Sequence, residues 1–275
     1  MSLPNEIFFL KGFNKMLIGN FDLILTGSER LKRNITAMNN NLLVKVTGDS
    51  RIDQVLSRKV KNQRDHFSRN PYKNIVLGSL IPSDYSVVFG GIRKYWGMKN
   101  GVQMEQQLIV VPHEVFERDI NELTDSLKEF GFSYSYYSQT KELGTSDTMI
   151  IDCVGILAEV YCYGFCAYVG AGFGAGVHSV IEPAVYTIPV AFGPNINLLD
   201  EAVELANLGA GIVVKSREDF ASFLELAEKK SEIPIELTRK FIDGKNGASR
   251  RIVENILKSV EEGYFVGEFQ LASTI

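Results

Sequence analysis

The chain repeats one pattern from Phe21 onward, in which a short apolar run is followed by a longer segment with apolar residues at every third or fourth position. Residues 74–77, 107–111 and 189–192 are apolar runs with the length of buried strands. Residues 114–130 show the helical spacing, and Gly131 supplies a stop signal at their end. Strands that alternate with helices in this way predict an α/β fold with a doubly wound parallel sheet.

The same pattern predicts the remaining elements. Ser28 precedes an amphipathic segment and is expected to cap the helix that begins there. Residues 86–89 form a short apolar stretch to which the pattern assigns no helix. Further strands are expected at 21–26, 42–46, 148–151, 167–169 and 211–214, and further helices at 28–37, 53–70, 155–163, 179–186, 199–207, 217–229, 235–241 and 248–260.

A basic segment divides the pattern in two. Seven Lys or Arg residues stand between Arg51 and Lys73 against two Asp residues, and Asn70-Pro71 ends the segment. We interpret it as a solvated linker helix, with a phosphate-binding or membrane-binding patch as the alternative. The expected domains are residues 1–70, residues 71–262 and a tail at 263–275.

Composition narrows the class of protein. Hydrophobic residues make up 45% of the 275 residues and charged residues 23%, which is typical of a globular chain that buries a sizeable core. A net charge of −4 argues against a dedicated nucleic-acid binder. The three cysteines match no zinc-binding spacing, and neither a membrane-spanning run nor a signal-peptide pattern stands out. We therefore expect a cytosolic protein, at most peripheral to a membrane.

Glycines at 170, 172, 174 and 176 follow the apolar run 167–169 and precede an expected helix start at His178-Ser179. Glycine lets the backbone approach a phosphate closely, and a helix N-terminus adds unpaired N–H groups. The pattern is neither a Walker loop nor a well-placed dinucleotide fingerprint. It predicts an anion-binding loop, and a tight turn without a ligand is the alternative.

Chemistry-bearing residues follow the ends of several expected strands. Because ligands of open α/β sheets bind outside the carboxyl ends of the strands, these residues predict a lined, nucleotide-binding crevice. They are Ser79, His113, Glu114, Asp152, the glycine run, His178 and Asn195, with Glu182 one turn further on.

Each of these residues has a structural alternative. Glu182 is expected to hold the hydroxyls of a ribose, or else to stabilise its own helix dipole. His178 is assigned to a phosphate or sugar carboxylate, or to a helix cap, and His113 and Glu114 to a base or phosphate, with Glu114 alternatively a first-turn acid. Asp152 is expected to cap the helix at 155–163. His66 is expected to be solvated, and Tyr134, Tyr136 and Tyr137 to belong to the core and a sheet edge.

Two runs carry a family resemblance: Val169-Gly-Ala-Gly-Phe-Gly-Ala-Gly-Val-His-Ser-Val-Ile-Glu-Pro183 and Ile188-Pro-Val-Ala-Phe-Gly-Pro-Asn195. With them the chain resembles the 3-deoxy-D-manno-octulosonic acid (Kdo) transferases, which are GT-B glycosyltransferases of lipid A assembly. The resemblance extends over residues 8–260. Further similar stretches lie at 46–53, at 76–79 together with Pro82 and Asp84, and at 110–114, 136–139 and 150–155, the last three in the form found in Bacteroidetes.

The resemblance implies an inverting transfer of Kdo from CMP-Kdo to a lipid A precursor at the inner membrane of a Gram-negative bacterium. It implies a GT-B fold whose second, Rossmann-like domain binds the donor, without a metal or other cofactor. The donor-binding residues would be Ser79, His113, Glu114, Gly172, Gly174, Gly176, His178, Glu182 and Asn195.

The chain departs from the family pattern at two motifs. Pro112-His113 stands where many members have Pro-Arg-His, and Leu80-Ile81 replaces a tryptophan that often follows Gly-Ser. Residues 1–70 match only the last β/α units of the N-terminal domain, which in this family binds the acceptor and carries the glutamate base. We therefore expect a chain that binds CMP or CMP-Kdo but transfers sugar poorly alone, and that self-associates through exposed apolar surface.

Three other functions stay open at this point. The first is a GT-B enzyme that uses a UDP- or GDP-sugar. The second is a non-catalytic nucleotide-sugar binding module, and the third is a sugar-nucleotide epimerase of the same fold.

Overall fold

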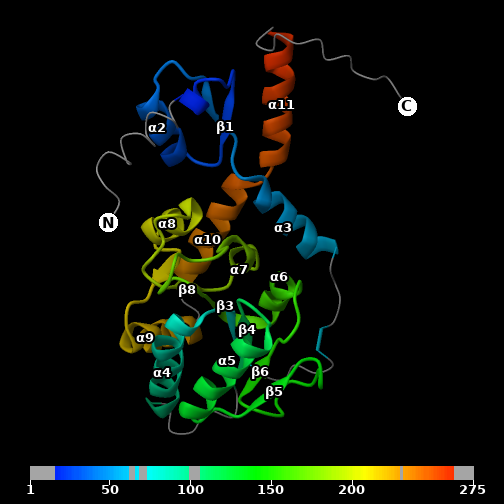
Figure 1. Cartoon of the computed structure of the whole chain (residues 1–275), viewed down its shortest axis with the longest axis vertical. Helices are drawn as coiled ribbons and strands as arrows, with labels where there is room; N and C mark the ends of the chain where they lie inside the picture. Colours follow the sequence, from blue (N-terminus) through cyan, green and yellow to red (C-terminus); the bar gives the residue numbers. More distant parts are fainter. Residues whose placement is uncertain (1–15, 62–65, 68–72, 99–105, 230–231, 263–275) are drawn as a thin grey trace. The chain divides into compact units, whose positions relative to one another are not determined.

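The computed structural model describes residues 16–61, 66–67, 73–98, 106–229 and 232–262. The chain forms two compact units, residues 1–53 with 245–275 and residues 54–244 (Figure 1). The break after Asp53 differs from the predicted boundary beside Pro71, because most of helix α3 (Ser50–Lys61) belongs to the second unit. There Lys59 Nζ donates a 2.8 Å hydrogen bond to the carbonyl of Val185. Beyond α3, only residues 66–67 of the predicted linker are described, and the tail at 263–275 lies outside the described residues. The identification of the parts as acceptor and donor domains stays a prediction.

The smaller unit contains the first predicted strand–helix–strand segment. Strands β1 (Ile24–Thr26) and β2 (Val44–Val46) pair in parallel, and helix α2 (Glu29–Met38) connects them. The Ser28 hydroxyl accepts the N–H of Leu31 at 3.1 Å, which confirms the predicted cap. Helix α11 (Ala248–Glu261) completes this unit.

The stretch 47–53 holds the N-terminus of α11. The Asp53 carboxylate accepts the N–H of Gly247 at 2.8 Å and the N–H of Ser249 at 2.6 Å. Burial opposes this charge, but the N–H groups of residues 247–249 hold the pKa of Asp53 below its usual value. Arg251 Nε donates to the carbonyl of Thr47 at 2.7 Å. Two stretches about two hundred residues apart are thereby joined by charge-assisted hydrogen bonds.

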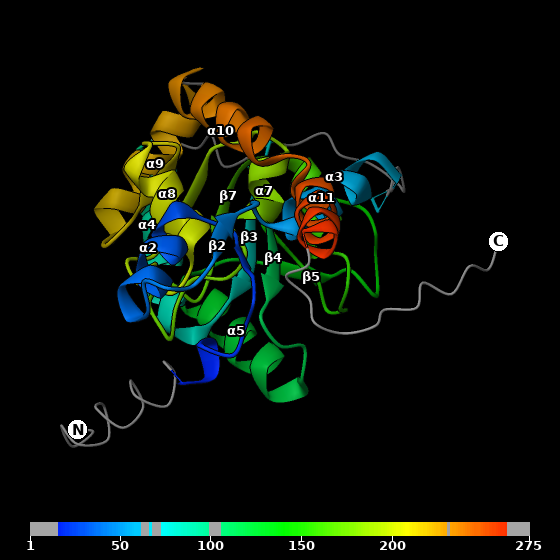
Figure 2. The same ribbon diagram turned by 90° about the horizontal axis from the view of Figure 1, so that it is seen from above.

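The larger unit is built on one seven-stranded sheet in which every pair is parallel, as predicted. The strand order is β5-β6-β4-β3-β7-β8-β9, and Figure 2 shows β3, β4 and β7 side by side. The strands are β3 (Lys73–Leu80), β4 (Gln106–Pro112), β5 (Tyr134–Tyr136), β6 (Thr148–Ile150), β7 (Gly164–Val169), β8 (Val190–Phe192) and β9 (Gly211–Val213).

Alternate residues of the strands face two different cores. Ile75 and Leu77 pack into a cluster with residues of three helices, α4 (Pro82–Met98), α5 (Glu117–Glu129) and α9 (Arg217–Glu228). Val76 faces the opposite cluster, which includes Tyr161 of the short 3-10 helix η2 (Tyr161–Tyr163). Successive side chains of a strand point to opposite faces of the sheet, and here both faces are covered. Nearly every position of these strands is therefore apolar. The remaining helices are α6 (Leu157–Val160), α7 (Ile181–Val185), α8 (Asp200–Asn207) and α10 (Glu232–Lys245).

Helix α4 is the long element that the sequence pattern missed. It is buried on most of its sides, so its apolar residues form no single stripe. Gly90 and Gly91 stand in its middle, where a Cβ on Gly91 would lie 2.7 Å from the Cβ of Phe220 in α9. The glycine pair therefore marks a close helix–helix contact. Sequence reasoning treats such a pair as a break.

The sheet has a topological switch between β3 and β7. The chain leaves β3 toward the face that carries α4, and after β7 it reaches Tyr186 and Ile188, which pack on the opposite cluster. The carboxyl ends of these two strands are the expected position of a ligand. Within the described residues, no helix is long and apolar enough to span a membrane, and no group of three or more His, Cys, Asp or Glu side chains could hold a metal.

Candidate functional site

The glycine loop after β7 is packed against two other backbone segments. A Cβ on Gly170 would lie 2.3 Å from the carbonyl oxygen of Ser79, and one on Gly172 would lie 2.6 Å from the Cα and N of Gly193. Gly174 is closed off by the side chain of Ile81 at 2.7 Å. These glycines are required because the ends of β3, β7 and β8 meet without room for side chains.

A buried carboxylate, Asp84, organises the same loop. Its side chain is fully buried at the start of α4 and accepts the N–H of Ala171 at 2.8 Å, the N–H of Ile81 at 3.1 Å and the hydroxyl of Tyr168 at 3.0 Å. The N–H of Phe173 adds a longer contact at 3.4 Å. Burial raises the pKa of Asp84, and these donors oppose the shift. Sequence reasoning gave this residue no role.

Most backbone N–H groups of the loop are used within the protein, and among residues 170–178 only those of Gly172 and Ala175 have no acceptor in the described part of the chain. The N–H groups of residues 170, 171, 173, 174 and 176–178 all donate within the protein. Helix α7 begins at Ile181, two residues after the expected start of the helix at 179–186, and is five residues long. In the described part of the chain, the N–H of Ser179 has no acceptor, and Ser179 faces the adjoining hollow.

That hollow of about 290 Å³ lies at the carboxyl ends of β3, β4 and β7. It brings together four of the residues predicted from sequence, Ser79, His113, His178 and Glu182. Arg58 of α3, which the sequence analysis assigned to the linker helix, also lines it. The other lining residues are Gly155, Leu157, Ala158 and Ser179.

The backbone is strained at both strand ends that form the hollow. Among the described residues, three that are not glycine have positive φ, and two of them are Ser79 at φ 53° and Ala171 at φ 67°. At Ser79 the register between β3 and β4 shifts. Such strain persists only where the surrounding structure imposes it, and it concentrates at functional sites.

Two histidines from different strands form the wall of the hollow. The rings of His113, after β4, and His178, after β7, are stacked with centroids 4.3 Å apart and planes 22° apart. Burial, and then the neighbouring His113, lower the pKa of His178, while Asp84 opposes this shift. His178 is consequently neutral near pH 7.

The only carboxylate among the residues that line the hollow is Glu182, on α7. Burial raises the pKa of Glu182, Arg58 lowers it and Glu159 raises it further. Among the described residues, Arg58 makes neither a hydrogen bond nor an ion pair. Its guanidinium is exposed on the same hollow, so it is available to an anion. Arg58 is thus exposed on a helix, as predicted for the basic segment, and it also lines the hollow, which the sequence did not indicate.

Three other predicted residues, Asn195, Gly176 and Glu114, are not among the residues that line this hollow. Asn195 Nδ2 donates to the carbonyl of Gly174 at 2.7 Å, and Gly176 has φ 144° and no close backbone neighbour at its Cβ position. The side chain of Glu114 is 52% exposed, 3.7 Å from His113 Nε2 and outside the lining of the hollow. These positions support the shape of the loop or lie beside the site.

Two further expectations were wrong. Asp152 does not cap α6. It accepts the N–H and the hydroxyl of Ser138, because the turn after β5 comes back over the end of β6. His66 is not solvated: its N–H donates to the hydroxyl of Tyr163, and its Nε2 is buried. The tyrosines at 134 and 136 do lie in β5 at the sheet edge.

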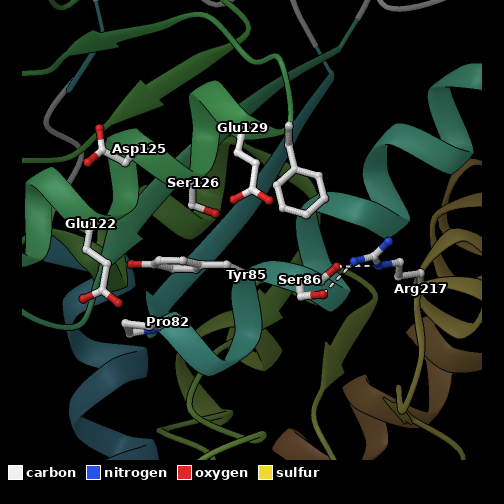
Figure 3. A pocket seen from close by; sticks show the side chains of 9 residues that line it. Pro82, Tyr85, Ser86, Glu122, Asp125, Ser126, Glu129 and Arg217 are labelled. Atoms are coloured by element: carbon white, nitrogen blue, oxygen red, sulfur yellow. Dashed lines mark hydrogen bonds between the residues drawn. The ribbon is translucent and has the colours of Figure 1, made fainter.

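A second hollow, of about 630 Å³, lies between α4, α5 and α9 (Figure 3). Its wall carries the acids Glu122, Asp125 and Glu129, and its one cation, Arg217, already donates to Ser86. None of the residues predicted from strand ends lines it. Its chemistry is therefore unsuited to a nucleotide phosphate, despite its larger volume.

The chain is similar to curated proteins of one kind. It is 30% identical over 173 residues to the 3-deoxy-D-manno-octulosonic acid transferase of Aquifex aeolicus, a match that covers 62% of this chain and 46% of the relative. It is 24% identical over 262 residues to the same enzyme of Chlamydia trachomatis, covering 91% of this chain and 58% of the relative. The chain thus spans about half the length of the curated relatives it matches. No protein-family model matches it.

Solved structures with the same fold are also glycosyltransferases or their domains. The C-terminal CMP-Kdo binding domain of WaaA from Acinetobacter baumannii aligns with a TM-score of 0.54 at 15% identity, covering 69% of this chain and 96% of that one. A trehalose 6-phosphate synthase from Burkholderia multivorans aligns with a TM-score of 0.59 at 11% identity, covering 91% and 62%. The chain therefore has the α/β fold of GT-B glycosyltransferases and is a sequence relative of the Kdo transferases.

Proposed function

We propose that this chain supplies the donor half of a Kdo transferase and binds CMP-Kdo in the hollow at the ends of β3, β4 and β7. The observation that carries the proposal is the convergence of Glu182, Arg58 and the stacked histidines at the topological switch of a sheet shared with a CMP-Kdo binding domain. In such sheets the ligand lies where adjacent strands send their connections to opposite faces.

Different groups in the hollow contact different parts of the donor. Glu182 accepts hydrogen bonds from the ribose hydroxyls, since a carboxylate with no permanent partner in the hollow is a strong acceptor. Arg58 and the N–H of Ser179 face the negative groups of the ligand. Arg58 thereby provides the permanent charge that an arginine at position 113 would give, where this chain has histidine.

The reaction that fits this site is an inverting transfer. A hydroxyl of a lipid A precursor would attack the anomeric carbon of Kdo, the bond from that carbon to the phosphate oxygen would break, and CMP would leave with the electron pair. The cations in the hollow would stabilise the growing negative charge on the leaving phosphate. The base that accepts the hydroxyl proton is not assigned to a residue of this chain. A lipid acceptor would bring the protein to a membrane surface.

The test is calorimetric titration of the full chain with CMP, with three variants. Glu182→Gln and Arg58→Gln should each weaken binding about tenfold or more, because each removes a charge-assisted hydrogen bond of about 1.5–3 kcal/mol. Glu129→Gln, in the second hollow, is the matched control and should bind CMP like the unmodified chain. Loss of binding in the control, with no change in Glu182→Gln, would place the ligand in the wrong hollow and overturn the proposal.

A further inference from the structure

The stacked histidines of the donor hollow differ from its other charged residues because their charge depends on pH. His113 and His178 come from different strand ends, and their rings lie 4.3 Å apart and nearly parallel. Two cationic rings at this distance repel each other, so the pair does not hold two charges without a neighbouring anion. An imidazole that gains a proton becomes a cationic donor, and in this pair we assign that change to His178.

The fixed charges around the pair sum to zero within the hollow. Arg58 contributes one positive charge and Glu182 one negative charge, and the other lining residues apart from the histidines carry none. Three more acids lie around it: Glu114 is 3.7 Å from His113, Asp84 lies behind the loop at His178, and Glu159 acts on Glu182. Among the described residues, the side chains that line the hollow therefore carry no net fixed charge for an anionic ligand, and Lys59 of α3 lies beyond the lining, where it donates to the carbonyl of Val185.

CMP-Kdo carries two negative charges, one on its phosphodiester and one on the sugar carboxylate. Placing them in a half-enclosed site without compensating charge is costly. Resting on the donor site proposed above, we propose that ligand binding is coupled to protonation of His178, which is stacked on His113 in the hollow. Donor affinity then falls as the pH rises above neutrality.

The direction follows from the state of the free site. Burial and the neighbouring ring keep the pKa of His178 low, so without a ligand this ring is neutral at pH 7. An anion within about 4–6 Å favours the charged form and raises the pKa, so binding draws a proton from the solvent. Glu182, whose pKa burial raises, is the competing acceptor of that proton.

Proton uptake on ligand binding can be assigned to single residues in this chain, because it contains only three histidines. The probe is the carboxymethyl ester of CMP, a phosphodiester with a carboxylate, whose two charges are fixed between about pH 6 and pH 8. Its binding enthalpy is measured at pH 7 in buffers of different ionisation heat, which gives the number of protons taken up. The full chain is compared with His113→Asn, His178→Asn and, as a control, His66→Asn.

We expect uptake of about half to one proton per ligand, and a Kd about three to ten times lower at pH 6 than at pH 7.5, since each proton adds at most tenfold per pH unit. Both effects should shrink in His178→Asn and persist in His66→Asn. Binding without proton uptake, or uptake unchanged in both pocket variants, would refute the coupling and leave the donor site intact. Absence of binding would refute the donor site as well.

Discussion

The strongest test of how the glycine loop is built is the replacement of Asp84 by asparagine. The substitution keeps the size of the side chain and exchanges one accepting oxygen for an NH₂ group. In the native protein one oxygen accepts the N–H groups of Ile81 and Ala171, and the other accepts the Tyr168 hydroxyl and the N–H of Phe173. An amide can serve only one of these two pairs as an acceptor.

The less costly orientation places the amide oxygen toward Ile81 and Ala171. The NH₂ group then faces Tyr168, whose hydroxyl can turn to accept, but it also faces the N–H of Phe173. One buried donor is left without a partner, at a cost of about 1–3 kcal/mol. We expect Asp84→Asn to lower the free energy of unfolding by about 2 kcal/mol and the urea midpoint by about 1 M.

Urea denaturation followed by circular dichroism measures this change. Asp125→Asn is the matched control, because that side chain is 75% exposed on α5 and pairs only with Lys128 there. It should change the free energy of unfolding by less than about 0.5 kcal/mol. Tyr168→Phe should also cost less when combined with Asp84→Asn than in the native chain, with a coupling of about 0.5–3 kcal/mol. Equal midpoints for Asp84→Asn and the native chain would refute the role given to this carboxylate.

Three further outcomes follow from the packing and the charges. Gly172→Ala should destabilise the chain by about 1–3 kcal/mol, because its Cβ would meet the Gly193 backbone at 2.6 Å, whereas Gly97→Ala in α4 has free space and should stabilise it by up to about 1 kcal/mol. Thermal denaturation with equal midpoints would contradict this contrast. Asp53→Asn should increase amide hydrogen exchange in the first turn of α11, since one N–H loses its acceptor, and unchanged exchange would count against that anchor. The pKa of His178 is lower in the folded than in the unfolded chain, so stability should fall as the pH drops below the unfolded value of 6.5, and less so in His178→Asn. Denaturation at pH 8 and pH 5.5 measures this, and an equal loss in both proteins would exclude His178 as the cause.

Local sequence rules were sufficient for most of the parallel strands of the larger unit but not for all of its helices. Apolar runs such as 74–77 are recognisable because a parallel strand is buried on both faces. Helix α4 was not recognisable, because burial on most sides removes the stripe that marks a helix and Gly90-Gly91 imitates a break. The helix is buried by packing against α9, which lies more than a hundred residues further along the chain, so local sequence could not reveal it.

The site was predicted in outline and missed in detail for a similar reason. Strand ends could be placed, so Ser79, His113 and His178 were expected near one another. The contribution of Arg58 could not be seen, because nothing local shows that α3 reaches the hollow. The glycines were predicted to form an anion-binding loop, which stays a prediction, but their packing against Gly193 could not be seen in the sequence. Asp84 would have been found only by asking which acceptor satisfies the buried N–H groups of the loop.

The central claim is that the hollow at the ends of β3, β4 and β7 binds a cytidine nucleotide. Calorimetric titration of the full chain with CMP, UMP, UDP and GDP under identical conditions tests it most directly. We expect CMP to bind at least about tenfold more tightly than any of the others, a difference of about 1.4 kcal/mol. Tighter binding of UDP or GDP would keep the glycosyltransferase fold and overturn the donor, and a chain that binds none of the four would contradict the assignment of this hollow altogether.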